Sequence, residues 1–132
     1  MNLFTVKLKN EPGALARVAA AMASRGVDVR ALGGGGIGEV GVAMFVTDND
    51  MATREALMAT NSEFSEAEAI VADVVDRPGT LARLTQALAD AGVNVQGAVV
   101  MQWMNDRARL AFAVDDPTKA REALRSAGAM GM

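Results

Sequence analysis

The chain has no cysteine, no histidine and no tyrosine among its 132 residues. Without cysteine it has no disulfides, no thiolate metal sites and no cysteine nucleophile. The absence of histidine removes the commonest general base and the commonest ligand of transition metals. We therefore expect that the protein has no metal site and no other cofactor. We also expect that it is not an enzyme.

Aromatic residues are scarce, with one tryptophan and four phenylalanines, and the basic residues are scattered along a chain of net charge −3. The chain thus lacks the basic stripe and the stacking platform of a nucleic-acid-binding protein. Its longest apolar run is far shorter than the ~20 residues of a membrane span. The N-terminus alternates apolar and polar residues and has no signal-peptide block. We expect a globular, cytoplasmic protein.

The chain contains the same segment twice. Residues 10–29 read NEPGALARVAAAMASRGVDV and residues 76–95 read DRPGTLARLTQALADAGVNV, with ten identical positions at an offset of 66 residues. The tetrapeptide Arg-Glu-Ala-Leu also recurs, at residues 54 and 121. We predict two domains, at residues 1–68 and 69–132. Because domains this small bury little surface alone, we expect them to pack on each other, in an extended sheet or face to face, and the chain to form a homodimer.

The hydrophobic pattern of each repeat predicts strand, helix, strand, strand, helix, strand. Pro12 suits a first helical turn, and Leu15 with Val18 and Met22 marks the apolar face of the first helix. In the first repeat we expect strands at residues 4–8, 27–30, 40–46 and within 64–69, a helix from Pro12 that Gly26 ends, and a helix at about 51–60. In the second we expect strands at residues 70–75, 93–103 and 107–114, a helix carrying Leu81, Leu84 and Leu88 that Gly92 ends, and a helix that begins at Pro117.

This order predicts an α+β protein with two tandem ferredoxin-like βαββαβ units, each a four-stranded antiparallel sheet with two helices on one face. The fourth strand of the first repeat runs almost directly into the first strand of the second, so we expect little or no linker. Only residues 129–132 are left for the last strand, which we expect to be short.

Three other features have ordinary structural interpretations. The glycine run Gly33 to Gly38 is expected to be a hairpin turn, because no Lys-Ser/Thr follows it and the next element is a strand, unlike in a phosphate-binding loop. The acidic pairs before the second helix of each repeat, Asp48 with Asp50 and Asp115 with Asp116, are expected to cap those helices instead of binding calcium. Trp103 is a ligand lid, a dimer anchor or a partly buried edge residue.

Each repeat places Pro-Gly where its first strand turns into its first helix. The first amides of a helix have no partner inside it and favour an anion, such as the carboxylate of a free amino acid. Gly13 and Gly79 remove a side chain that would obstruct that approach. Asp28 and Asn94, at the start of the second strand, are expected at the same sheet edge, where either accepts a hydrogen bond from the ligand's ammonium group. Helix capping alone is the alternative explanation of the Pro-Gly pair.

A strand followed by Asn/Asp-x-Pro-Gly-x-Leu-Ala-Arg and then by Gly-Val-Asn/Asp-Val resembles the ACT domain, a family of small amino-acid-sensing regulatory domains of metabolic enzymes. The first copy is also similar to the start of acetolactate synthase regulatory subunits. The resemblance covers both repeats and implies ligand sites where two such domains meet. The candidate ligand-binding residues are Asn10, Glu11, Pro12, Gly13, Ala14, Leu15 and Asp28 in the first repeat, and Asp76, Arg77, Pro78, Gly79, Thr80, Leu81 and Asn94 in the second.

We therefore expect an allosteric sensor that binds a small amino acid and has no catalysis of its own. Its second copy is the better site, because Asn94 is neutral and Thr80 adds a hydroxyl, whereas Asp28 adds a charge. One alternative is a detached regulatory subunit of an amino-acid biosynthetic enzyme, and another is a duplicate that no longer binds ligand. An enzyme is the alternative from a different class of function, since fold alone does not settle function. Against it, the chain has no Gly-x-Ser-x-Gly elbow and no paired carboxylates at repeated positions.

Overall fold

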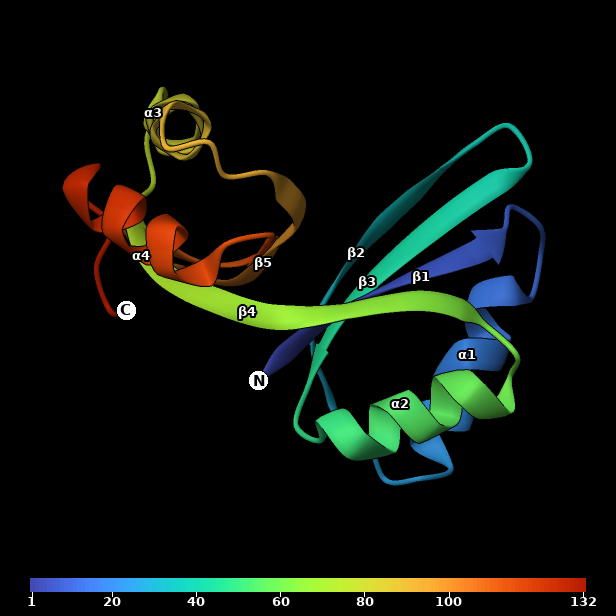
Figure 1. Ribbon diagram of the computed structural model, residues 1–132. Coiled ribbons are helices and arrows are strands. Elements are labelled where there is room, and N and C mark those ends of the chain that lie inside the picture. Colours follow the sequence, from blue (N-terminus) through green and yellow to red (C-terminus); the bar gives the residue numbers. More distant parts are fainter. The chain divides into compact units, whose positions relative to one another are not determined.

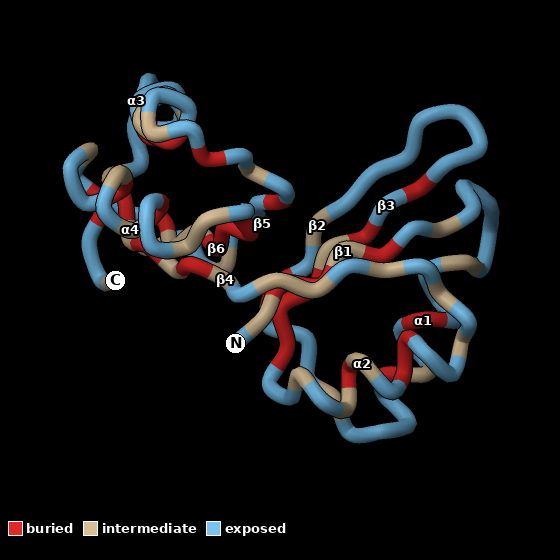
Figure 2. The backbone as a smooth tube through the Cα atoms, in the orientation of Figure 1, coloured by how far each residue is buried: buried red, intermediate tan, exposed pale blue.

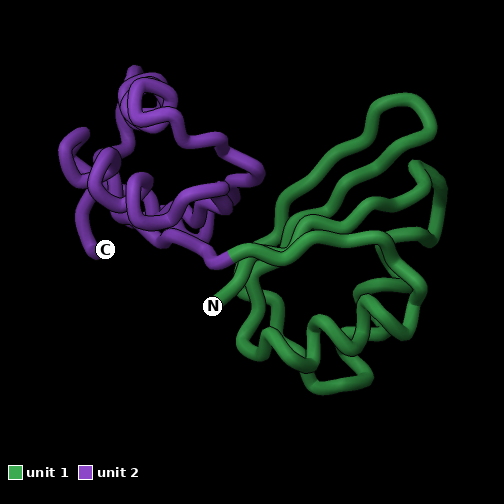
Figure 3. The backbone as a smooth tube through the Cα atoms, in the orientation of Figure 1, with its two compact units in different colours: residues 1–67 green, residues 68–132 purple.

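The computed structural model describes all 132 residues, and the chain forms two compact units. Unit 1 comprises Met1–Ala67 and unit 2 comprises Glu68–Met132, so the division lies one residue from the predicted one (Figure 3). Within each unit, two helices pack on one face of the strands (Figure 1). None of the helices has the length and apolar character needed to cross a membrane.

Unit 1 consists of β1 (Asn2–Lys9), α1 (Ala14–Ala23), β2 (Val29–Ile37), β3 (Val40–Thr47), α2 (Asp50–Ala59) and the first part of β4 (Glu63–Val75). Its strands lie in the order β2-β3-β1-β4. Both β1 and β2 pair with β3 in antiparallel fashion. They therefore run in the same direction, and α1 is the crossover that returns the chain to the end where β1 began.

Unit 2 consists of the rest of β4, α3 (Thr80–Asp90), β5 (Val95–Met104), β6 (Arg107–Val114) and α4 (Pro117–Ser126). Its strands lie in the order β4-β6-β5, again with antiparallel pairing. In place of a full fourth strand, Met130 makes a single antiparallel bridge with Asp73, as the shortness of the remaining chain predicted. Since β4 passes through the division between the units, the absence of a linker is confirmed, and so is the ferredoxin-like fold class.

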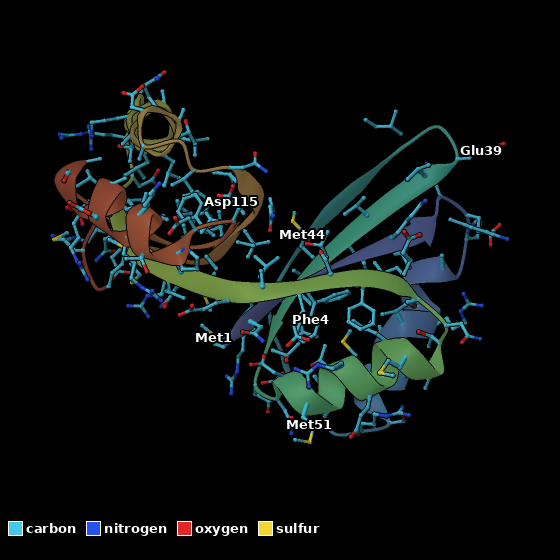
Figure 4. All side chains as sticks on the ribbon, viewed as in Figure 1. Met1, Phe4, Glu39, Met44, Met51 and Asp115 are labelled. Atoms are coloured by element: carbon cyan, nitrogen blue, oxygen red, sulfur yellow. The ribbon has the colours of Figure 1, made fainter.

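Alternate residues of the inner strands form a core beneath the helices of each unit. Phe4 points from β1 toward the helices of unit 1 (Figure 4) and is fully buried. Buried segments in Figure 2 follow this pattern along the strands and the inner helix faces. The largest core side chains are Phe4, Val6, Val18, Met22, Phe45 and Leu57 in unit 1, and Ile70, Leu84, Leu88, Phe112 and Leu124 in unit 2. Each contributes about 1.5–3 kcal/mol on burial.

Three local predictions were wrong. Gly33 to Gly36 belong to β2 and pair with β3, and the turn is confined to Gly38, with φ of 60°, and Glu39. Pro12 precedes α1 instead of starting it, because the chain needs one further residue, Gly13, to turn into the helix. Asn49, and neither Asp48 nor Asp50, caps α2, since only its side chain accepts a hydrogen bond from a first-turn amide, that of Ala52.

Candidate functional site

The first helix of each unit begins without a side-chain cap. α1 follows Gly13 (φ 88°) and α3 follows Gly79 (φ 90°), and at neither start does a side chain accept a hydrogen bond from the first amides. A left-handed backbone at these positions favours glycine. By contrast, Asn49 caps α2 and Asp116 caps α4, each through its side-chain oxygen. The Ala14 and Thr80 amides donate to carbonyls of their own turns, at 3.4 and 3.3 Å, so the open amides are those that follow them. These open amides carry the positive end of the helix dipole, and that end favours a negative group.

In both units this open helix start borders a cavity. The cavity of unit 1 has a volume of about 460 Å³, and that of unit 2 about 280 Å³. In unit 1 the turn contributes Asn10, Glu11, Ala14 and Leu15, and in unit 2 it contributes Asp76, Arg77, Thr80 and Leu81. The floor of each cavity is the helix-side face of the hairpin, β2–β3 in unit 1 and β5–β6 in unit 2. The structure thus brings eight of the fourteen candidate residues to the two cavities.

The floors of the two cavities differ in size of side chain. In unit 1 the paired positions are Gly34 with Ala43 and Gly36 with Gly41, whereas the corresponding pairs in unit 2 are Val100 with Leu110 and Trp103 with Ala108. Smaller floor residues leave more space, which accounts for the larger cavity of unit 1. Trp103 lies at the edge of the unit 2 cavity and is 66% exposed. The interpretation of Trp103 as a partly buried edge residue was therefore wrong.

Thr80 is the buried polar residue of the unit 2 cavity. The residue is 5% exposed, and its hydroxyl oxygen is shielded from solvent and has no hydrogen-bond partner. The other buried threonines, Thr47 and Thr53, bond to each other at 2.7 Å. Ala14 stands at the equivalent position of unit 1, at the start of a helix with the same geometry. The fold therefore does not require a hydroxyl at this position.

Asp28 and Asn94 do not lie at these cavities, so the prediction that they share a sheet edge with the turns of their own units was wrong. Val29 pairs with Thr47 near the start of β1, and the Asp28 amide donates to the Asp48 carboxylate at 2.9 Å. The turn lies at the other end, where the Asn10 amide donates to the Glu39 carbonyl at 2.9 Å. Met1 and Glu39 mark these opposite ends in Figure 4.

The same separation holds in unit 2. The amide of Asn94 donates to the carboxylate of Asp115, which follows the last residue of β6, at 2.9 Å. The amide of Asp76 donates to the carbonyl of Asp106, which precedes the first residue of β6, at 2.8 Å. The physical reason is the direction of the second strand. A crossover helix makes β1 and β2 parallel, so β2 starts where β1 starts, about 20 Å from the turn for a strand of this length.

Sequence reasoning missed the cavity floors and misplaced two leucines. Leu15 and Leu81 follow the helical pattern of the core but are exposed beside the cavities. The alternation of Ala98 and Val100 with intervening residues is a strand signal that indicates one shared face, and it places these side chains together on the floor.

In the chain as a whole, no three acidic side chains gather closely enough to hold a metal ion.

Comparison with known families identifies the fold of these sites. Residues 69–102, which span the turn, α3 and most of β5, match the model of the ACT domain family. The family match lies within unit 2. Unit 1 repeats its order of elements and its strand-to-helix turn, so the prediction of a tandem ACT protein is confirmed. No curated protein matches the chain by sequence.

Solved structures share the fold of the whole ACT pair. A protein from Bacteroides thetaiotaomicron is 18% identical with a TM-score of 0.77, and the match covers 97% of this chain and 88% of that one. The ligand-free regulatory subunit of aspartate kinase from Thermus thermophilus is 21% identical with a TM-score of 0.67, covering 96% and 91%. The aspartate kinase of Clostridium acetobutylicum is 16% identical with a TM-score of 0.61, covering 96% and 32%.

Proposed function

We propose that this chain is a regulatory protein that binds a free amino acid and has no catalysis of its own. The observation that carries the proposal is the repeated pairing of an uncapped helix start with a cavity. The ACT domain and the similarity to an aspartate kinase regulatory subunit support a regulatory role. The absence of histidine and cysteine argues against the commonest forms of acid–base and nucleophilic catalysis.

In unit 2 the ligand's carboxylate faces the first amides of α3, where the helix dipole favours negative charge. Arg77 lies at the same cavity and forms no ion pair within the chain, so it adds attraction for the carboxylate. Asp76, also at the cavity, is the acidic side chain available to the ligand's ammonium group. This assignment replaces Asn94, which lies at the other end of the unit.

A detached regulatory subunit is the second candidate, favoured because the chain matches nearly the whole of a protein described as the regulatory subunit of aspartate kinase. The proposed partner is an enzyme of amino-acid metabolism. Affinity purification of the tagged chain from its native cell, followed by mass spectrometry, tests this candidate. A stoichiometric enzyme that is retained with the chain supports it, and recovery of the chain alone contradicts it.

A thermal-shift panel of the twenty amino acids tests the proposed function. A ligand at one hundred times its dissociation constant adds ~2.7 kcal/mol of stability, which corresponds to an increase of roughly 10 °C or more in the melting temperature of a small domain. We expect at least one amino acid to give such an increase. No increase with any of the twenty at millimolar concentration would contradict the proposal.

A matched pair of variants locates the site. Ala98→Trp places a large side chain on the floor of the unit 2 cavity and is expected to abolish stabilisation by the ligand at that unit. Ala89→Trp makes the same change at an exposed position of α3 that does not line the cavity, and the ligand should still stabilise it. Equal ligand responses of the two variants would remove the unit 2 cavity from consideration.

A further inference from the structure

Met130 makes the single bridge that takes the place of a fourth strand in unit 2. Its amide donates to the Asp73 carbonyl at 2.9 Å, and its carbonyl accepts from the Asp73 amide at 2.8 Å. On its other side Asp73 pairs with Arg109 of β6. The attachment of Met130 therefore determines whether this edge of β4 is closed at Asp73 or leaves its backbone groups open to another chain.

The side chain of Met130 is both accessible and hydrogen-bonded. The residue is 39% exposed, and its Sδ accepts a hydrogen bond from Nη1 of Arg107 at 3.4 Å. Of the nine methionines, Met130 is the one whose sulfur accepts a hydrogen bond. Met51 and Met58 of α2 are more exposed, at 66% and 64%, but neither has such a donor. Arg107 forms no ion pair within the chain, so no carboxylate competes for its guanidinium group.

Oxidation converts the weak acceptor of this hydrogen bond into a strong one. The Met130 sulfur attacks one oxygen of hydrogen peroxide, the O–O bond breaks, and the S–O bond of a sulfoxide forms. The sulfur loses two electrons to the peroxide, whose second oxygen takes the proton of the first and leaves as water. Because the new oxygen is bonded to the atom that Arg107 already contacts, it is placed to accept a charge-assisted hydrogen bond from the guanidinium group.

We propose that Met130 is a site of oxidation by peroxides, and that Arg107 binds the sulfoxide and so fastens residues 129–132 to β4. Methionine oxidation usually has the opposite effect, because a polar sulfoxide disrupts apolar packing. Met130 is not part of the apolar core of unit 2, and its sulfur already contacts a cation. The modification is reversible, since methionine sulfoxide reductases restore the thioether. It does not depend on the proposed amino-acid-binding function.

Treatment of the whole chain with hydrogen peroxide tests the proposal. Peptide mass spectrometry locates the sulfoxides, and NMR measures hydrogen exchange of the Asp73 amide. We expect a sulfoxide at Met130 and none at the buried Met22. The Asp73 amide should then exchange at least about three-fold more slowly, because a charge-assisted hydrogen bond is stronger than one to a thioether. A Met130 that stays reduced while Met51 and Met58 are oxidised, or exchange at Asp73 that is unchanged or faster, overturns the proposal.

The control for the other methionines is Met130→Leu, in which the same treatment should not slow exchange at Asp73. Met130→Gln supplies a side-chain oxygen without oxidant and should slow this exchange relative to Met130→Leu. This comparison needs no change at Arg107, so it decides the matter even if an arginine variant does not fold.

The role of Arg107 is tested by Arg107→Ala, which should remove the slowing in the oxidised chain. Arg25→Ala, at an exposed arginine of unit 1, is the matched control and should retain the slowing. Equal slowing with and without Arg107, or equal exchange in Met130→Gln and Met130→Leu, overturns the proposal.

Discussion

At the scale of single residues, two carboxylates of β4 are held in their ionised form by arginines. Glu66 accepts two hydrogen bonds from Arg54, at 2.7 and 2.6 Å, and Asp73 accepts two from Arg109, at 2.8 and 3.2 Å. Hydrogen bonding from Arg54 holds the pKa of Glu66 below its ordinary value, and that from Arg109 does the same for the pKa of Asp73. Bidentate pairs of this kind are the stronger class of ionic hydrogen bond.

These pairs predict a loss of stability in acid. A depressed pKa means that Glu66 stabilises the fold above about pH 4.3, the ordinary glutamate value, and that this stability is lost as pH falls through the lower folded value. We expect Glu66→Gln to be less stable than the wild type at pH 7 and to lose less stability between pH 7 and pH 3. Urea unfolding at both pH values measures the difference.

The control for this measurement is Glu122→Gln, which changes an exposed carboxylate of α4 that has no ion pair. The control should match the wild type at both pH values. If Glu66→Gln lost as much stability in acid as the wild type does, the ion pair with Arg54 would not be the source of the pH dependence.

At the scale of the helices, the second helix of each unit is capped and the first is not. The Asp116 carboxylate accepts a hydrogen bond from the Lys119 amide at 3.1 Å, and Pro117 follows as the first residue of α4. The start of α3 has no such cap, although Ser, Thr, Asn and Asp are the residues preferred there. The difference repeats in unit 1 and therefore belongs to the architecture of the unit.

The cap of α4 can be tested directly. Asp116→Ala removes the acceptor for the Lys119 amide and should lower the free energy of unfolding by about 1 kcal/mol. Asp116→Asn retains an acceptor of similar geometry, so its effect should be within a few tenths of that of the wild type. Chemical denaturation of the three proteins gives the comparison, and equal losses in the two variants would show that the cap is not what stabilises α4.

At the scale of the whole molecule, the two units share a fold but differ in the cavities beside their first helices. Unit 1 has the larger cavity, with Ala14 where unit 2 has Thr80. Asp28 and Asn94 lie away from the cavities, so the charge of Asp28 does not distinguish the two sites. The expected difference between the two ligand sites follows instead from the size and lining of the two cavities. Homodimer formation and packing of the two units on each other remain predictions.

We therefore expect fewer than two equivalent ligand sites per chain, with unit 2 filled first. Titration calorimetry of the wild type measures the stoichiometry, and two identical, independent sites would refute the expectation. The reciprocal substitution Ala14→Thr gives unit 1 the hydroxyl of unit 2 and should strengthen its binding. Ala16→Thr, which makes the same change at an exposed position of α1 outside the cavity lining, is the control and should have no effect.

Much of the fold was predictable because its determinants are local and present twice. Alternation in β1, helical spacing in α3 and the turn residues between them each indicate one element, and the second copy supports the same order. The glycine run was misassigned because glycines usually interrupt strands, whereas hydrogen bonds to β3 hold Gly33 to Gly36 in an extended strand. That pairing is a property of the sheet and leaves no local signal.

The sequence by itself determined the duplication, the order of the elements and the location of the turns that border the cavities. Each follows from patterns within about twenty residues, whose physical causes are backbone preference and the burial of one apolar face. Only the tertiary structure decided which residues meet there. Strand direction moved Asn94 away from the turn, and strand pairing brought Val100 and Leu110 to the cavity floor. Burial without a partner then distinguished the hydroxyl of Thr80, because a hydrogen bond that is missing is visible only after every neighbouring group is in place.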